Sequence, residues 1–199
     1  MTSHVHHMPR ASTKEQIVTA AVETLHRKGF NATSVEDITN AAQVPKGSFY
    51  NHFKSKEDLA VEALDRYWQN MQTSLGLLSD EKTPPVARLK RHFRQLGKVA
   101  REGGYRAGCM IGNMSTEMPE QSRPVRERLT VLLVAWSCAI ESCIKEAQAD
   151  GSIRSDMDTR TISGFLLSSW EGAVMHSKVD RGAESLTAFE DVVFTVLTL

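Results

Sequence analysis

The sequence predicts an all-α protein of about nine helices, and three observations lead to this fold class. Apolar residues recur at helical spacing, as in residues 13–28, where Ile17, Ala21 and Leu25 share one face. Residues that begin or end helices separate such segments at short intervals. Strand-like alternation and internal repeats do not occur in the sequence. We therefore expect helices packed on helices.

Capping signals place the first four helices. Gly29 follows a basic turn and is expected to end the first helix. Ser34 and Asp37 have the spacing of a capping box, which predicts a second helix from about Val35. Pro45 suits the first position of a third helix, because its missing N–H would have no partner there. The expected segments are 13–28, about 35–42, 46–53, and a longer helix capped by Ser55 that runs through about Leu78.

Prolines, glycines and apolar stripes mark the remaining helices. A helix entered through two prolines closes at Gly103 and Gly104, and a short apolar helix near Cys109 ends before Pro119. The turn-rich segment DGSIRSDMD separates a long helix from the final two. The expected segments lie within 83–104, 109–118, 121–149, 157–177 and 183–198.

Length and composition are those of an ordinary globular protein. The chain has 199 residues, of which 41% are hydrophobic and 24% charged, and its formal net charge is zero. The longest apolar run, at 131–140, is too short to cross a membrane, and residues 1–10 lack the apolar core of a signal peptide. The three cysteines have no zinc-like spacing. We expect a cytoplasmic protein without membrane association, metal or cofactor.

Residues 45–59, PKGSFYNHFKSKEDL, crowd small and polar groups onto one short helix. Three short helices joined by tight turns have the layout of a helix-turn-helix unit. In such a unit the last helix lies in the DNA major groove, with its N-terminal residues at base edges. Phe49 and Phe53 are four residues apart and are expected to point inward together. The residues left on the other faces are Lys46, Gly47, Ser48, Tyr50, Asn51 and His52.

These exposed groups suit different contacts with DNA. Gly47 lets the backbone approach closely, Ser48 and Tyr50 offer hydroxyls to phosphates, and Lys46 can reach a phosphate or a guanine edge. Residues 1–60 contain seven Lys and Arg against six Asp and Glu, a net charge of +1. Electrostatic attraction to DNA must therefore come from the local placement of charge.

The segment TSVEDITNAAQVPKGSFYNHFKSKEDL closely resembles the DNA-binding signature of the TetR family of bacterial repressors. The match extends over about residues 14–60. The resemblance implies a homodimer that binds operator DNA and a small-molecule inducer. It also implies three parts in each protomer: a flexible tail (1–10), a helix-turn-helix domain (11–56) and a ligand-binding and dimerisation domain (57–199).

Carried over residue by residue, the resemblance assigns contacts with DNA. Asn51 falls at a position that varies in the family, where it can help to set operator choice. The residues implied to lie near bases are Lys46, Gly47 and Ser48. The residues implied to contact phosphates are Ser34, Tyr50, His52 and Lys56.

The segments GYRAGCMIGNMSTEM, IKEAQADGSI and SSWEGAVMHSK resemble a subgroup of TetR-type regulators that share a Gly-Cys-hydrophobic-hydrophobic-x-Asn segment. This subgroup includes repressors that answer quinones, aldehydes, maleimides and acrylate-like acids, which implies a similar inducer class. Cys109 is expected at a helix start, three residues after Arg106, and both features would stabilise a reactive thiolate. In the alternative interpretation Cys109 is a small buried hydrophobe under the ligand pocket. Cys138 lies in an apolar run and is expected in the core.

Aromatic, methionine and polar residues of the larger domain have two interpretations. They could line a ligand cavity, or they could be plain core at helical spacing. His176 could likewise orient an acidic or carbonyl ligand, or it could be structural. The residues predicted to sense or bind ligand are Cys109, Met110, Asn113, Met114, Trp136, Trp170 and His176.

The last two helices each carry an apolar stripe that predicts a twofold four-helix bundle between subunits. A charge at Val193 is then expected to produce monomers. The stripes are Ile162, Phe165, Leu166, Ser169 and Ala173 on the first helix, and Leu186, Phe189, Val193 and Val196 on the second.

The sequence thus predicts a repressor that a small, electrophilic inducer releases from a pseudo-palindromic operator. A first alternative is the same regulator with a larger apolar effector bound non-covalently. A second is a small all-α enzyme, although no hydrolase, phosphate-loop or metalloprotease motif is present. In the tail, Thr2-Ser3-His4 could bind Cu(II) or Ni(II) once Met1 is removed, or it could be a disordered segment.

Overall fold

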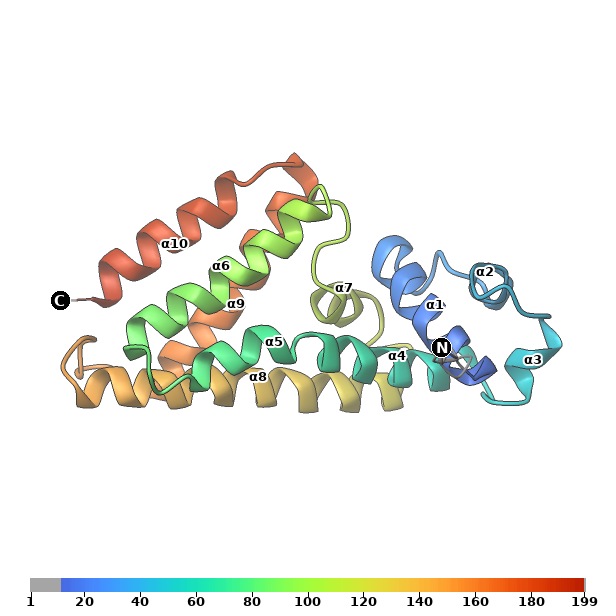
Figure 1. Cartoon of the computed structure of the whole chain (residues 1–199), viewed down its shortest axis with the longest axis horizontal. Helices are drawn as coiled ribbons and strands as arrows, with labels where there is room; N and C mark the ends of the chain where they lie inside the picture. The colour runs from blue at the N-terminus through green and yellow to red at the C-terminus, as the bar shows by residue number, and fades with distance from the viewer. Residues whose placement is uncertain (1–11, 199) are drawn as a thin grey trace, which may run out of the picture.

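The computed structural model describes residues 12–198 and shows a small group of N-terminal helices beside a longer helical body (Figure 1). Over these residues there are ten α-helices, one short 3-10 helix and an isolated β-bridge between Ile153 and Thr198. The all-α prediction is confirmed. None of the described helices is long and apolar enough to cross a membrane. The expected tail, 1–10, and its proposed copper site lie outside the described residues.

The N-terminal group consists of α1 (Thr13–Lys28), α2 (Val35–Ala41) and α3 (Gly47–Tyr50). The predicted capping box is present: the Ser34 hydroxyl accepts a hydrogen bond from the Asp37 N–H, and the Asp37 carboxylate accepts one from the Ser34 N–H. This pairing satisfies backbone donors that the first turn of α2 would otherwise leave open. The helices bury a shared apolar core that includes Ile17, Leu25, Ile38, Phe49 and Phe53.

Helix α3 is shorter than the predicted segment 46–53. Its N–H groups bond three residues back, from Ser48 to the Pro45 carbonyl and from Phe49 to the Lys46 carbonyl. After Tyr50 the chain continues as a turn, in which the Phe53 N–H still reaches the Phe49 carbonyl. This turn places Phe53 beside Phe49, with ring centroids 5.5 Å apart, as the four-residue spacing predicted.

The single helix predicted through Leu78 is divided in three, which accounts for the extra helix. Helix α4 (Lys56–Asn70) is followed by α5 (Gln72–Leu75) and the 3-10 helix η1 (Gly76–Ser79). At the break, the Met71 N–H is shared between the carbonyls of Tyr67 and Trp68. Just beyond it, Ser74 forms hydrogen bonds with His92 of the neighbouring helix. Docking against that helix sets the direction of α5, and local sequence carries no sign of it.

The longer body is built from the five remaining helices, with α8 running along its length (Figure 1). Helix α4 packs against both α1 and α8, and therefore joins the two groups of helices. Aromatic side chains fill the middle of the body: Phe93 lies 5.3 Å from Trp170 and 4.9 Å from Phe189 between ring centroids. The helices are α6 (Pro85–Glu102), α7 (Met110–Glu117), α8 (Arg123–Ala149), α9 (Thr159–Asp180) and α10 (Glu184–Leu197).

Two predictions about this body are wrong. Cys138 is exposed on α8, because its neighbour Trp136 takes the inward position on the helix. The stripes predicted to join two subunits mostly pack inside one protomer, where Val193 is only 6% exposed. Because α10 packs on both α9 and α6, its larger apolar residues are buried before any second chain is added. The apolar residues left outside on α9 and α10 are Phe165, Met175, Val179, Val192 and Val196.

Candidate DNA-binding surface and ligand cavity

The residues around α3 divide sharply into buried and exposed sets. Phe49 is fully buried, whereas the adjacent Tyr50 is 62% exposed and stacks edge-on against the Phe49 ring. A side chain at Gly47 would meet no atom within 4 Å, so the surface above this residue is open. The other exposed residues of the predicted DNA-reading set are Lys46, Asn51 and His52, with Ser48 partly exposed.

Three residues with implied DNA contacts already have partners within the protein. The Lys46 ammonium lies 3.3 Å from the Glu36 carboxylate in an exposed pair, which is weak and screened by salt. The Ser34 hydroxyl donates to Asp37 at 2.6 Å. The Lys56 ammonium donates to the carbonyls of Phe30 and Thr33, so it holds the loop between α1 and α2. A phosphate contact by Lys56 would use the third of its N–H groups.

A mostly apolar cavity of about 420 Å³ lies between the N-terminal helices and the longer body, within the usual range for small-molecule sites. A larger groove between α6 and α10 is open and lined by charged residues such as Lys90, Arg94 and Glu190. The cavity wall includes Val22 and His26 of α1, so part of the DNA-binding end faces the cavity directly. The rest of the lining is Tyr67, Asn70, Met71, Thr73, Ser74, Gln95, Leu96, Val99, Ala100, Gly103, Ala107, Gly108, Cys109, Trp136, Trp170 and Val174.

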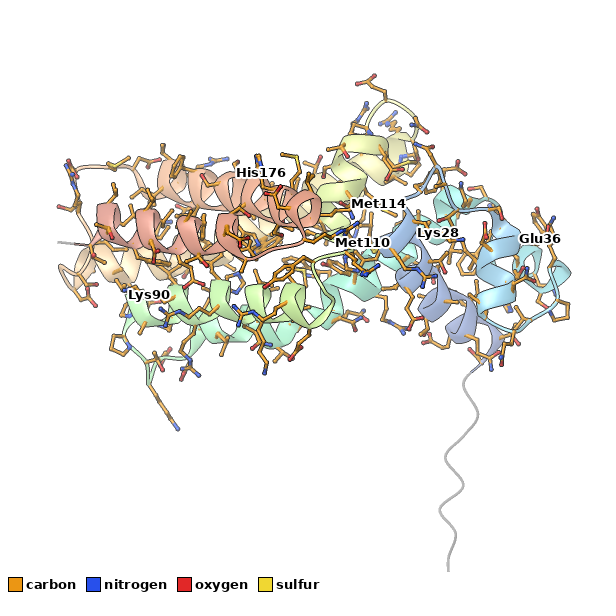
Figure 2. The ribbon with its side chains drawn as sticks, turned by 90° about the horizontal axis from the view of Figure 1, so that it is seen from above. Lys28, Glu36, Lys90, Met110, Met114 and His176 are labelled. Carbon is orange, nitrogen blue, oxygen red and sulfur yellow. The ribbon has the colours of Figure 1, made fainter. Side chains whose placement is uncertain are left out.

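The cavity collects only some of the predicted ligand residues. Cys109, Trp136 and Trp170 line it. Met110 and Met114 are buried in the core instead, and Figure 2 shows them where α7 meets the N-terminal helices. Asn113 is tied into the protein, donating to the Ala107 carbonyl at 2.7 Å and accepting from Lys178 at 3.2 Å. His176 is exposed on α9 and away from the cavity lining, because the helix turns this position outward.

His26 and Tyr67 belong to the cavity wall and were missed from the sequence. The His26 Nε2–H donates to the Gly108 carbonyl at 2.7 Å, across 82 residues of chain, and the His26 ring packs edge-on against Tyr67. Burial lowers the pKa of His26, which keeps the ring neutral. No sequence motif indicates the contacts of His26 with Gly108 and Tyr67, since the sequence shows His26 only as part of the basic last turn of α1.

His92 forms a buried polar network behind the cavity. The Trp136 indole N–H donates to His92 Nε2 at 3.1 Å, so His92 carries its proton on Nδ1 and donates it to the Ser74 carbonyl at 2.9 Å. Burial lowers the pKa of His92 to about 4. Ser74 and Trp136 both line the cavity, so this network fixes the position of two of its walls.

The surroundings of Cys109 contradict the expected thiolate. Cys109 precedes α7 as predicted, but it is only 7% exposed and burial raises its pKa well above the usual value. The Glu171 carboxyl raises the pKa of the thiol further, the Gly112 backbone and the Tyr67 hydroxyl oppose it more weakly, and Arg106 is exposed. A carboxylate disfavours a neighbouring thiolate, so the cysteine is a protonated thiol at neutral pH.

Helix α7 connects the cavity to the DNA-binding end. It begins next to Cys109 in the cavity wall, and at its other end the Glu117 carboxylate accepts a hydrogen bond of 3.0 Å from the Asn31 N–H. Asn31 lies in the loop between α1 and α2. One short helix therefore bridges Cys109 and the loop that precedes α2. Within residues 12–198, no group of three or more His, Cys, Asp or Glu is placed to hold a metal ion.

Comparison with known proteins gives consistent matches over the whole length. The chain is 37% identical over 191 residues to the HTH-type transcriptional repressor DhaR of Mycobacterium sp. strain GP1, covering 96% of this chain and 94% of that protein. It is 32% identical over 185 residues to the transcriptional regulator AcuR of Cereibacter sphaeroides, covering 91% and 84%. The crystal structure of regulatory protein TetR from Rhodobacter sphaeroides matches with a TM-score of 0.89 at 28% identity, covering 94% of this chain and 100% of that chain.

Two family profiles match separate parts of the chain. The profile of bacterial regulatory proteins of the tetR family matches residues 17–63, which include most of α1 and all of α2 and α3. The profile of the tetracyclin repressor-like C-terminal domain matches residues 85–193, more than half of the chain. The chain therefore belongs to the TetR family of bacterial regulatory proteins, and it is a DNA-binding transcriptional regulator and not an enzyme.

Proposed function

We propose that the protein is a homodimeric repressor that leaves a pseudo-palindromic operator when a small molecule enters the cavity. The observation that carries this proposal is the cavity itself, because α1 of the DNA-binding end supplies part of its wall through Val22 and His26. A ligand that changes the shape of this wall acts on the helix-turn-helix directly. Residues 11–56 then form the DNA-binding domain, and residues 57–199 form the domain for ligand binding and dimerisation.

At the operator, the exposed surface of α3 enters the major groove. Lys46, Gly47 and Ser48 lie near base edges, and Asn51 contributes to operator choice. The Lys46 pair with Glu36 is exposed on both sides and opens at little cost when phosphates or bases compete. The residues that contact phosphates are Ser34, Tyr50, His52 and Lys56.

The dimer is supported by apolar residues that remain outside the protomer. Val179 on α9 is 75% exposed, and Val192 and Val196 on α10 are each 61% exposed. Together with Phe165 and Met175 they form what we call the outer α9–α10 surface. Large exposed apolar side chains on two helices that pack against each other favour a contact site here. A twofold contact here would place two α3 helices on one side of DNA, as a symmetric operator requires.

The inducer class has two candidates, both consistent with a small and mainly apolar cavity. In the first, an electrophile such as a quinone, an enal or an acrylate-like acid adds to Cys109, which lines the cavity. The adduct occupies the cavity beside the start of α7, and it shifts α7 and α4 where its shape does not fit the existing walls. In the second, an apolar effector binds reversibly against Trp136 and Trp170. The raised pKa of the Cys109 thiol favours this second candidate unless a base assists the reaction.

Operator selection, DNA-binding assays of variants and release by an enal together test the operator and the inducer. Selection from random duplexes should return a symmetric site, and fluorescence anisotropy should show weaker binding of Tyr50→Phe to all sequences alike, because only a phosphate partner is lost. Lys46→Ala should change base preference as well. An enal should release the wild type and not Cys109→Ser, if induction is covalent. Selection without an enriched symmetric site would contradict the operator, and normal release of Cys109→Ser would leave the reversible effector.

A further inference from the structure

Three polar groups from three helices meet at one end of the cavity. They are the Tyr67 hydroxyl of α4, the Cys109 thiol at the start of α7 and the Glu171 carboxyl of α9. Tyr67, Cys109 and the two neighbours of Glu171 in the helical pattern, Trp170 and Val174, line the cavity. A nucleophile and a hydroxyl therefore line the cavity, and a carboxyl lies against the nucleophile.

The backbone of α7 makes room for the carboxyl. A side chain at Gly112 would place its Cβ 2.1 Å from Glu171 Oε2 and 3.7 Å from Cys109 Cβ. Only glycine at this position allows the carboxyl to lie against the first turn of α7 beside the thiol. The placement of Glu171 is thus specific to the sequence of α7 and depends on a residue with no side chain.

Apart from its contact with the Cys109 thiol, the Glu171 carboxyl has no hydrogen bond or ion pair within the described residues. Its Oε1 atom is buried without a hydrogen-bond partner in the described part of the protein, and burial raises its pKa to about 7. The nearby basic groups are engaged elsewhere: the Lys178 ammonium of α9 donates to Asn113, and the neutral His26 ring of α1 donates to the Gly108 carbonyl. Tyr67 is the remaining titratable group against the thiol, and burial raises its pKa well above 10, so it stays neutral. A carboxyl with a buried, unpartnered oxygen and a pKa near neutrality is typical of a group that exchanges protons.

We propose that Glu171 is the base that accepts the Cys109 proton when the thiol adds to an α,β-unsaturated carbonyl compound in the cavity. This inference rests on the proposed covalent induction and names the residue that makes it possible. Because the thiol is buried and protonated, it needs an adjacent acceptor to react at neutral pH.

The reaction is a balanced addition. The Cys109 sulfur forms a bond to the β-carbon, the carbon–carbon π bond breaks, and the thiol proton passes to the Glu171 carboxylate. Electron density moves onto the carbonyl as an enolate, and Glu171 then returns the proton to the α-carbon. The carboxylate is regenerated and no oxidant or reductant is consumed.

Removal of the Glu171 carboxylate distinguishes a base from a purely electrostatic neighbour, because the two roles predict opposite changes in the alkylation rate of Cys109. If Glu171 only repels a thiolate, Glu171→Gln lowers the thiol pKa and speeds alkylation. If Glu171 accepts the proton, the same substitution slows alkylation even though a thiolate is then less disfavoured. General bases typically contribute about 10²–10⁴-fold in rate.

The test uses the full-length protein, N-ethylmaleimide as the electrophile, and mass spectrometry to follow adducts on each cysteine between pH 5.5 and 9. In the wild type, the Cys109 rate should rise with an inflection near pH 7, where Glu171 ionises. Glu171→Gln should slow it about 10²-fold at pH 7 and remove that inflection. The exposed Cys138 serves as an internal reference, and Glu120→Gln, at an exposed carboxyl just after α7 and outside the cavity lining, should match the wild type.

Three outcomes overturn the inference. They are an equal or faster rate in Glu171→Gln, a wild-type rate that rises steadily up to pH 9 without an inflection near pH 7, and alkylation of Cys138 without Cys109. The second needs no variant and holds even if Glu171→Gln fails to fold. Operator binding, measured by anisotropy on the same samples, tests covalent induction separately from the base role of Glu171. Alkylated Cys109 with retained operator binding defeats covalent induction while leaving the base role intact.

Discussion

The DNA-binding end and the cavity wall use polar side chains in opposite ways. Around α3 the polar residues are exposed, and their partners are local, as in the Ser34–Asp37 capping box. At the cavity, His26 is partly buried in the wall and His92 is fully buried behind it, and their partners come from distant parts of the chain, 82 and 44 residues away. The first arrangement leaves groups available for another molecule. The second uses polar groups to hold helices together around a space.

Because of this difference, function and stability depend on different residues around α3 and on the same residues at the cavity. An exposed side chain can be replaced at little cost to folding, whereas a buried donor or acceptor that loses its partner costs about 1–3 kcal/mol. Substitutions at α3 should therefore report on DNA binding alone. Substitutions in the cavity wall should change stability and ligand response together.

The largest expected effect arises in residues that never touch DNA. Val192→Lys on the outer α9–α10 surface should yield monomers by light scattering, because a charge is buried in the proposed interface. The monomer should bind the operator at least about 10²-fold more weakly, because the two half-sites then act independently. Val131→Lys, a similarly exposed valine on α8, is the matched control and should remain dimeric. A dimeric Val192→Lys protein would place the interface on another surface.

The next largest expected effect is a loss of stability in acid, which arises from the lowered pKa of His92 in the folded protein. Its pKa is about 4 in the folded protein and near 6.5 in the unfolded chain, so the unfolded state binds more protons between these values. Stability from this group is full above pH 6.5 and should fall by about 3 kcal/mol on lowering the pH to 4. Denaturant unfolding of wild type and His92→Gln measures the difference, since other titrating groups are common to both. Parallel losses in the two proteins would contradict the assignment.

The smallest expected effect on folding is at Asn51. This residue is exposed beyond α3, so Asn51→Ala should change the free energy of unfolding by less than about 0.5 kcal/mol. The base preference of the Asn51→Ala protein in an operator selection should nevertheless change. If stability falls while preference stays constant, Asn51 is a structural turn residue, and the contrast between the two regions does not extend to it.

Local signals in the sequence predict the DNA-binding end well. The capping box at Ser34, the cap at Ser55 and the inward pair Phe49–Phe53 depend on neighbours within four residues, and all three are present. The cavity is predicted less well. Trp136 and Trp170 line it, but Met110 and Met114 do not, because helical spacing identifies a buried face without saying whether that face meets a cavity or another side chain.

By itself, the sequence determined the helical fold, the order of the helices and the surface of α3, because periodicity, caps and turns act over short distances. Only the tertiary structure decided which buried groups meet. The predicted helix is interrupted at Met71, where Ser74 forms a hydrogen bond with His92. Cys138 is exposed and Val193 is buried, both against the prediction. The tertiary structure also placed Glu171 beside Cys109, although 62 positions separate them in the chain. Such pairings depend on how whole helices pack, and no local pattern records that.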